Sequence, residues 1–169
     1  IDLDSMSLNK RYYEKVSIEL IANCFLFLGT NSGPILLGSI FDKPTLLTNA
    51  TPFDHCLVHG KKTLSIFKFY RNKLDNDIIK ISSIKKFNIN TFKRDKLFNQ
   101  NQIKVIDNTP DDILNATKEI IKKIKNNDFK HSNIQKKFLR ILGKKAFSSN
   151  SSGIVAESFL KKYKSIIFH

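Results

Sequence analysis

Two spacings of apolar residues in the first fifty positions predict two kinds of element. Over residues 9–23 apolar groups recur every three or four positions, which predicts an amphipathic helix. Residues 25–28 form a continuous apolar run, typical of a strand that is covered on both faces of a parallel sheet. Pro44 then introduces a second apolar strand over residues 45–48. We expect the helix to pack on the sheet ahead of the first strand.

The middle of the chain has a less regular pattern. Short apolar segments at 64–70 and 78–81 are separated by polar residues 72–77, which predicts two small extended pieces or an irregular excursion. Residues 82–102 are rich in Lys and Asn and predict one or two short helices at the surface. Residues 103–106 are apolar again and predict the next strand.

The last third carries the clearest helix signals. The sequence TPDD at 109–112 combines a cap residue, a proline at the first helical position and acids in the first turn, so a helix is expected to run to about Lys125. A second helix is expected over 132–142, followed by a polar loop at 148–153. The C-terminal stretch 154–169 is expected to be helical, with an amphipathic pattern over 154–164. The alternation of strands and helices predicts an α/β fold, a Rossmann-like parallel sheet flanked by helices.

The turn after the first predicted strand is the main candidate site. It consists of Gly29, Thr30, Asn31, Ser32 and Gly33. The glycines permit backbone angles that other residues avoid, the middle residues favour turns and caps, and the proline that follows fits the start of a helix. The first N–H groups of a helix have no partner inside it, and the helix dipole places partial positive charge there. The turn therefore predicts a phosphate site.

Asn49 and Thr51 follow the second predicted strand and should reach the same edge of the sheet, where ligands of open α/β sheets bind. The turn at 29–33 matches neither the G-x-G-x-x-G pattern nor the G-x-x-x-x-G-K-[ST] pattern. The sequence thus gives no support for a dinucleotide-binding fold or a P-loop ATPase.

The net charge bears on which partners the protein binds, because the chain of 169 residues carries a formal charge of +14. Nucleic acid is an obvious candidate, yet only four of the 29 basic residues are Arg, the type that reads bases and forks onto phosphates. We therefore expect no nucleic-acid partner. Part of the lysine content either forms a solvated face or contacts anionic lipid. The lysines concerned are Lys118, Lys122, Lys123 and Lys125, with Lys161, Lys162 and Lys164 near the end.

Other candidate chemistry has little support. The pairs Asp2 and Asp4, and Asp75 and Asp77, have the D-x-D spacing of some metal-bound nucleotide sites, but neither pair follows a buried strand, so both are assigned to solvated turns. His55, Cys56 and His59 offer three zinc ligands without the fourth that a closed site needs. We expect no bound metal and no cofactor.

Three sequence runs resemble the C-terminal half of bacterial GT-B-type glycosyltransferases of surface polysaccharide biosynthesis, and more distantly fucosyltransferases and heptosyltransferases. The runs are IELIANC at 18–24, FLGTNSG at 27–33 and KPTLLTNATP at 43–52. Shorter pieces agree in order: KFY at 68–70, IDNTPDDI at 106–113 and SFLKKY at 158–163. The resemblance is dense at 18–52 and thin elsewhere.

This resemblance implies that residues 1–169 are a single nucleotide-sugar-binding donor domain, a fragment that lacks its N-terminal domain. The enzyme would transfer a sugar from a nucleotide-diphosphate sugar to a glycan or lipid-linked acceptor without a metal. Residues 29–33 would bind the donor diphosphate, and Asn49 and Thr51 would contact donor or acceptor. The general base would come from the missing domain, so the fragment alone should be inactive.

The sequence also bears on the location of the protein in the cell, and it leaves two alternative functions open. The sequence has no signal-peptide pattern and no run of about 18 apolar residues, so we expect a cytoplasmic protein. If the lysines contact anionic lipid, its place is the inner face of the cytoplasmic membrane. Two cysteines, Cys24 and Cys56, fit a reducing compartment. One alternative is a UDP-sugar epimerase-like domain, which would hold a diphosphate at the same turn. The other is a non-catalytic basic binding module.

Overall fold

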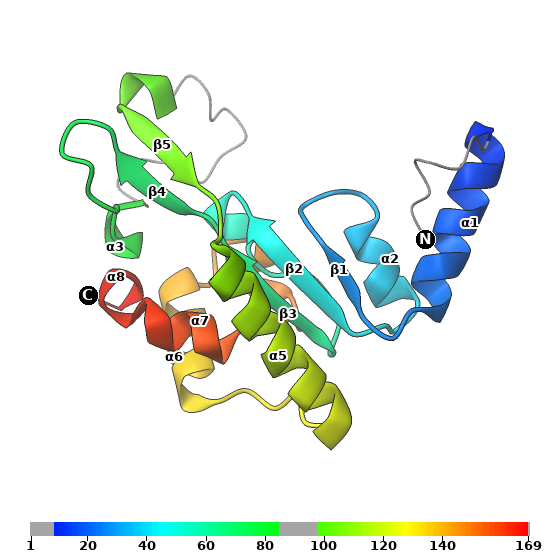
Figure 1. Cartoon of the computed structure of the whole chain (residues 1–169). Helices are drawn as coiled ribbons and strands as arrows, with labels where there is room; N and C mark the ends of the chain where they lie inside the picture. The colour runs from blue at the N-terminus through cyan, green and yellow to red at the C-terminus, as the bar shows by residue number, and fades with distance from the viewer. Residues whose placement is uncertain (1–8, 85–97, 169) are drawn as a thin grey trace.

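The computed structural model describes residues 9–84 and 98–168, and within them a four-stranded parallel sheet has the order β1-β2-β3-β6 (Figure 1). The strands are β1 (Phe27–Gly29), β2 (Thr45–Ala50), β3 (Thr63–Phe67) and β6 (Ile154–Val155). One row of paired residues crosses the whole sheet: Leu28, Leu46, Leu64 and Ile154. Helices flank this sheet, so the predicted α/β, Rossmann-like fold is confirmed.

Seven helices and two 3-10 turns lie around this sheet among the described residues. They are α1 (Lys10–Asn23), α2 (Ile35–Ile40), α3 (Ile81–Ile84), α5 (Pro110–Asn126), α6 (Asn133–Leu142), α7 (Glu157–Lys162) and α8 (Lys164–Ile167), with the 3-10 turns η1 (Phe53–His55) and η2 (Phe147–Asn150). Helix α5 lies across β2 and β3 and beside α7 (Figure 1). Most of the segment 82–102, for which one or two short helices were predicted, lies outside the described residues.

The start of α5 confirms the predicted helix signal. The Thr109 side chain accepts a hydrogen bond from the backbone N–H of Asp112, and the Asp112 carboxylate accepts one from the N–H of Thr109, which forms a capping box. Helix α6 begins after Ser132, whose N–H donates to the side chain of Gln135 at 2.8 Å. In both helices a side chain of the first turn, Asp112 or Gln135, therefore accepts a hydrogen bond from the N–H of the residue before the helix.

An aromatic cluster fills the core beside the parallel sheet. Phe67, at the end of β3, is fully buried and contacts the rings of Phe53, Phe69, Phe138 and Phe159 at centroid distances of 5.0 to 5.6 Å. These rings come from η1, β4, α6 and α7. The cluster thus joins elements that are far apart in the sequence, and edge-to-face ring pairs add to the burial of apolar area.

The segment between β3 and α5 differs from its prediction. Residues 64–70 supply β3, a fully buried inner strand, and the start of β4 (Phe69–Asn72). Strand β5 (Ile103–Ile106) is not the next parallel strand: it pairs antiparallel with β4 in a separate two-stranded sheet. Residue 78 forms only an isolated bridge to Arg71, and Ile81 begins α3. An apolar run predicts an extended segment, but it does not indicate which strand that segment will pair with.

The expectation for the N-terminal elements was partly wrong. Strand β1 is at the edge of the sheet, and Phe25 and Leu28 remain 62% and 46% exposed, although their run predicts a strand covered on both faces. Helix α1 forms as predicted, yet it packs against α2 and leaves Tyr12 and Leu20 exposed. The physical reason is that, among the described residues, β1 has a strand neighbour on one side alone.

The C-terminal segment was also predicted incorrectly at its start. Residues 154–155 are β6, paired with β3, and not the first turn of a helix. Two short helices, α7 and α8, follow within 154–169. Both residues of β6 are buried, and Ile154 and Val155 are β-branched, which favours a strand where the sheet has an open neighbouring position.

Candidate functional site

The carboxyl ends of β1 and β2 bring the predicted site residues to one edge of the sheet. Two hydrogen bonds fasten the turn at 29–33 to β2: the Thr48 hydroxyl donates to the carbonyl of Gly29 at 3.2 Å, and the N–H of Thr51 donates to Asn31 Oδ1 at 2.9 Å. The Thr51 hydroxyl lies 3.4 Å from the hydroxyl of Tyr70. The side chains of Asn31 and Thr51 therefore have structural partners at this edge.

Asn49 forms a reciprocal clasp with Asn108. Each residue's backbone N–H donates to the other's side-chain oxygen at 2.7 Å, and Asn108 Nδ2 donates to the carbonyl of Phe67 at 2.8 Å. Asn49 has a positive φ of 52°, which interrupts the register of β2 with β3. Asn108 was not predicted as part of this edge; its signal in the sequence is its place directly before the cap of α5. The clasp fixes the ends of β2 and β3 relative to α5.

The start of α2 does not have the free N–H groups that the turn predicted. Helix α2 has six residues and begins after Pro34, and the N–H groups of Ile35 and Leu36 donate to the carbonyls of Ser32 and Gly33 at 3.1 and 3.2 Å. This 3-10 tightening uses the first helical donors locally. Within the part of the chain that the structure describes, the backbone N–H groups of residues 31–33 donate no hydrogen bond, and all three residues are exposed.

The two glycines of the turn have ordinary backbone conformations. Neither Gly29 nor Gly33 is among the residues with positive φ, contrary to the reasoning from the sequence. A Cβ on Gly29 would lie 3.0 Å from Ile35 Cδ1, so close packing explains this glycine. A Cβ on Gly33 would meet nothing within 4 Å. Open space therefore remains at the exposed end of the turn.

A cavity of about 470 Å³ lies beside this turn. Asn31, Ser32 and Gly33 line one side of it, and Leu57, Val58 and the two helical residues Ile35 and Leu36 add apolar wall. The remaining lining residues are His55, His59, Phe147 and Ser151. Gly29, Thr30, Asn49 and Thr51 are not among the lining residues, so the structure separates the predicted set into three that face the cavity and four that do not.

An aromatic pair that was not predicted from the sequence also lines this cavity. The rings of His55 and Phe147 are stacked at a centroid distance of 4.1 Å and an angle of 16°, and Phe147 is 77% exposed. Ser148 holds this arrangement, because its buried hydroxyl donates to the carbonyl of Asp54 at 2.7 Å and so ties η2 to η1. Residues 148–153 are therefore not simply a polar loop.

Metal chemistry finds no support in this geometry. Among residues 9–84 and 98–168, no group of three or more His, Cys, Asp and Glu side chains could hold a metal ion. Cys56 is fully buried, and burial together with nearby Asp54 raises the pKa of its thiol. Asp75 accepts a hydrogen bond from the N–H of Asp77 at 2.9 Å, as in a solvated turn, which confirms that assignment. Asp2 and Asp4 lie outside the described residues.

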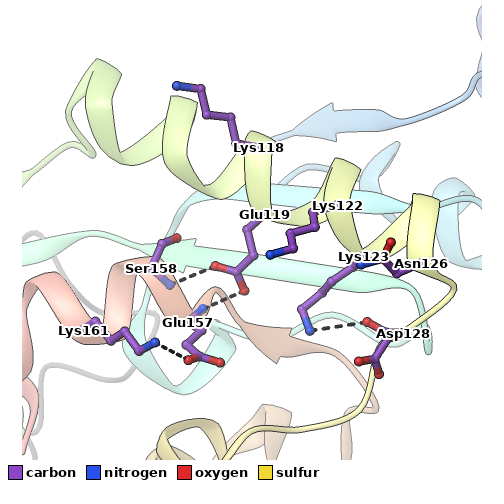
Figure 2. Close-up of a pocket in the computed structure, with 9 residues that line it drawn as sticks. All are labelled: Lys118, Glu119, Lys122, Lys123, Asn126, Asp128, Glu157, Ser158 and Lys161. Carbon is purple, nitrogen blue, oxygen red and sulfur yellow. Dashed lines mark hydrogen bonds and ion pairs between the residues drawn. The ribbon is translucent and has the colours of Figure 1, made fainter.

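Two of the lysine groups meet at a second hollow, of about 530 Å³, between α5 and α7. Figure 2 shows Lys118, Lys122, Lys123 and Lys161 around it, together with Glu119 and Glu157. The Glu119 carboxylate accepts hydrogen bonds from the N–H groups of Glu157 and Ser158, both at 2.8 Å, and Lys161 pairs with Glu157 at 2.6 Å. The protein's own carboxylate thus occupies the start of α7, and Lys161 is paired with an acid at this hollow.

Comparisons of the chain with protein-family models, curated proteins and solved structures find no match. No helix among the described residues is both long enough and apolar enough to cross a bilayer. The geometry of the two hollows is therefore the basis for a proposal on function. The hollow beside residues 31–33 combines backbone N–H groups that donate no hydrogen bond, the imidazoles of His55 and His59, and the exposed Phe147 ring.

Proposed function

We propose that this chain is the donor-binding domain of a glycosyltransferase and that the cavity beside residues 31–33 holds a nucleotide-diphosphate sugar. The observation that carries the proposal is that one cavity is lined by two kinds of residue. Residues 31–33 have backbone N–H groups that donate no hydrogen bond, and Phe147 is an exposed ring stacked on His55. A volume of about 470 Å³ lies in the range of small-molecule sites.

The diphosphate is assigned to the wall formed by residues 31–33. Backbone N–H groups of Asn31, Ser32 and Gly33 are hydrogen-bond donors for phosphate oxygens, with the Ser32 hydroxyl beside them. During transfer, the bond from the anomeric carbon to the diphosphate breaks, and the diphosphate leaves with the electron pair and growing negative charge. Donors already held in place stabilise that charge without reorganisation.

The nucleobase is assigned to Phe147. An exposed aromatic ring offers a stacking face to any base, and stacking of this kind contributes about 1–3 kcal/mol per base. The acceptor hydroxyl, whose oxygen forms the new bond to the anomeric carbon, and the base that takes its proton are assigned to a second domain. This chain by itself is then expected to bind the donor without turning it over.

Titration with UDP, GDP and inorganic pyrophosphate, followed by isothermal calorimetry and amide NMR, tests the proposal. We expect a nucleoside diphosphate to bind more tightly than pyrophosphate and to shift the amide signals of residues 31–33. Ser32→Asp should weaken binding by about tenfold or more, because it places negative charge against the phosphates. Ser165→Asp, on exposed α8, is the matched control and should leave affinity unchanged.

A second variant tests the base-binding part of the site separately from the diphosphate-binding part. Phe147→Ala should weaken nucleoside diphosphate binding by about tenfold but leave pyrophosphate binding unchanged, since only the base loses a stacking partner. Leu74→Ala, at an equally exposed apolar position in the β4 turn, is the control. If no nucleotide binds, or if binding is indifferent to Ser32→Asp, the donor site is wrong. Conversion of a UDP-sugar without any acceptor would assign the chain to the epimerase alternative instead.

A further inference from the structure

Strand β1 has an open edge. Within residues 9–84 and 98–168 it pairs with β2 on one side and with no strand on the other. The N–H of Phe27 donates to the carbonyl of Pro44, on the β2 side, so the N–H of Leu28, which alternates with it, points toward the open edge. An unpaired row of backbone donors and acceptors is a template for another strand.

The open edge has few of the usual protections. Edge strands that stay free are very short or carry charged side chains, prolines or bulges; β1 is short, with three residues, but has no charged side chain, no proline and a regular register with β2. Residues 20–41, which contain β1, include no Asp, Glu, Lys, Arg or His, although 26% of the whole chain is charged. Leu28 on this strand and Phe25, two residues before it, are exposed, and an apolar hollow of about 260 Å³ is lined by Phe27 of β1 and by Leu20 of α1 among others.

The distribution of charge along the chain bears on which partner can approach this edge. A chain with a net charge of +14 repels a second copy over most of its surface, and the uncharged stretch at 20–41 is where two copies can approach without that repulsion. A two-fold axis perpendicular to the sheet would bring β1 against β1 of the second copy in the antiparallel sense, with the same residues contributed by both. The contact is then self-complementary and closes after two copies.

We propose that two copies of this chain associate edge to edge through β1 and continue the parallel sheet of each into one sheet. Leu28 of each copy lies in the contact, and its N–H gains an acceptor across the two-fold axis. Phe25, 62% exposed in the single chain, is covered in the dimer. This inference does not depend on the proposed function, because it concerns the outer edge of β1 and not the cavity.

Sedimentation equilibrium and light scattering over a wide range of protein concentration test the dimer. We expect a concentration-dependent dimer, and Leu28→Lys should weaken it by about tenfold or more because it sets two like charges against each other. Leu74→Lys, at a residue 82% exposed in the turn after β4, introduces the same charge elsewhere and should leave the dimer intact. A monomer at every concentration overturns the proposal.

Hydrogen exchange of the unaltered chain gives a second readout that does not depend on how the variants fold. The amide of Leu28 should exchange more slowly as the dimer population rises, while exposed amides such as that of Leu74 should not change. If a dimer forms but the exchange of Leu28 is independent of concentration, the copies associate through another surface and the β1 contact is wrong.

Discussion

At the residue scale, Asp112 connects two parts of the molecule. Its side chain is 2% exposed and accepts hydrogen bonds from the N–H of Thr109 at 3.0 Å, from Lys162 Nζ at 2.6 Å and from the hydroxyl of Tyr163 at 2.9 Å. Burial by itself would raise the pKa of Asp112, but the hydrogen bonds from Lys162 and Thr109 outweigh it and hold the pKa below its usual value. The sequence predicted only the role at the start of the helix.

Replacing Asp112 with Asn should lower the free energy of unfolding by about 2 kcal/mol near neutral pH, because hydrogen bonds to a charged group are lost in a buried setting. Urea denaturation measures this. Asp111→Asn, the exposed neighbour in the same first turn, should cost well under 1 kcal/mol. Equal effects of the two variants would show that the links to Lys162 and Tyr163 add nothing.

The same carboxylate gives a pH dependence of defined sign. Because the pKa of Asp112 is lower in the folded chain than in the unfolded one, its stabilisation is complete above the unfolded pKa of about 3.9 and is lost as the pH falls through the folded pKa. The difference in unfolding free energy between the unaltered chain and Asp112→Asn should therefore shrink below about pH 4. A difference that stays constant into acid would contradict this.

At the element scale, the elements that were predicted correctly are fixed by local contacts, whereas β6, which was predicted wrongly, is fixed by contacts with distant segments. Helices α5 and α6 start where their caps predict, because cap residues satisfy N–H groups within the same turn. Strand β6 was predicted as helix, because its two residues are held by contacts outside the segment: pairing with β3, and the Gln135 side chain, which donates to the carbonyl of Val155 at 2.8 Å. A pattern of period 3.6 in 154–164 could not reveal either contact.

Gln135 should therefore be necessary for β6. It is 1% exposed, and its replacement by Ala leaves the Val155 carbonyl without this donor and the N–H of Ser132 without its acceptor. We expect the unfolding free energy to fall by about 2 kcal/mol in urea. Lys136→Ala, one position along the same helix and exposed, should stay within about 0.5 kcal/mol. Similar losses in both variants would assign the effect to helix propensity alone.

At the scale of the whole molecule, exposed apolar side chains and lysines lie mainly in different parts of the chain. Eight of the large apolar side chains that are exposed fall within residues 12–40, and this region has few buried residues of its own. The lysines lie mainly in the remaining part, where several meet acids, as Lys162 meets Asp112 and Lys68 meets Asp107. Composition predicted the net charge, but only the folded chain shows which lysines are offset by acids.

Moderate salt should stabilise this chain. A net charge of +14 repels itself in the compact state, and raising the ionic strength from about 0.01 to 0.15 M shortens the screening length from about 30 to 8 Å. The unfolding temperature measured by calorimetry should rise with NaCl over this range. Replacing the exposed Lys136, Lys144 and Lys164 with Gln should reduce the rise, and a flat or falling response in the unaltered chain would contradict the argument.

The sequence by itself determined the elements whose causes are local. Caps, prolines and the spacing of apolar residues act within a few positions, so the α/β class, helix α1, the starts of α5 and α6 and the turn after β1 could all be predicted. Gly29, Thr30, Asn31, Ser32 and Gly33 were correctly placed at the end of a strand, but which of them line the cavity was not predictable.

Only the tertiary structure decided which surfaces meet. It put β1 at an edge and β3 inside, turned β5 into an antiparallel partner of β4, and brought Phe147 and Gly33 to the same cavity. The physical reason is that an apolar pattern states how much of an element is buried and with what period, but the side chains that bury it come from segments far away in the chain. The same reason explains why the open edge of β1 became visible only in the folded chain.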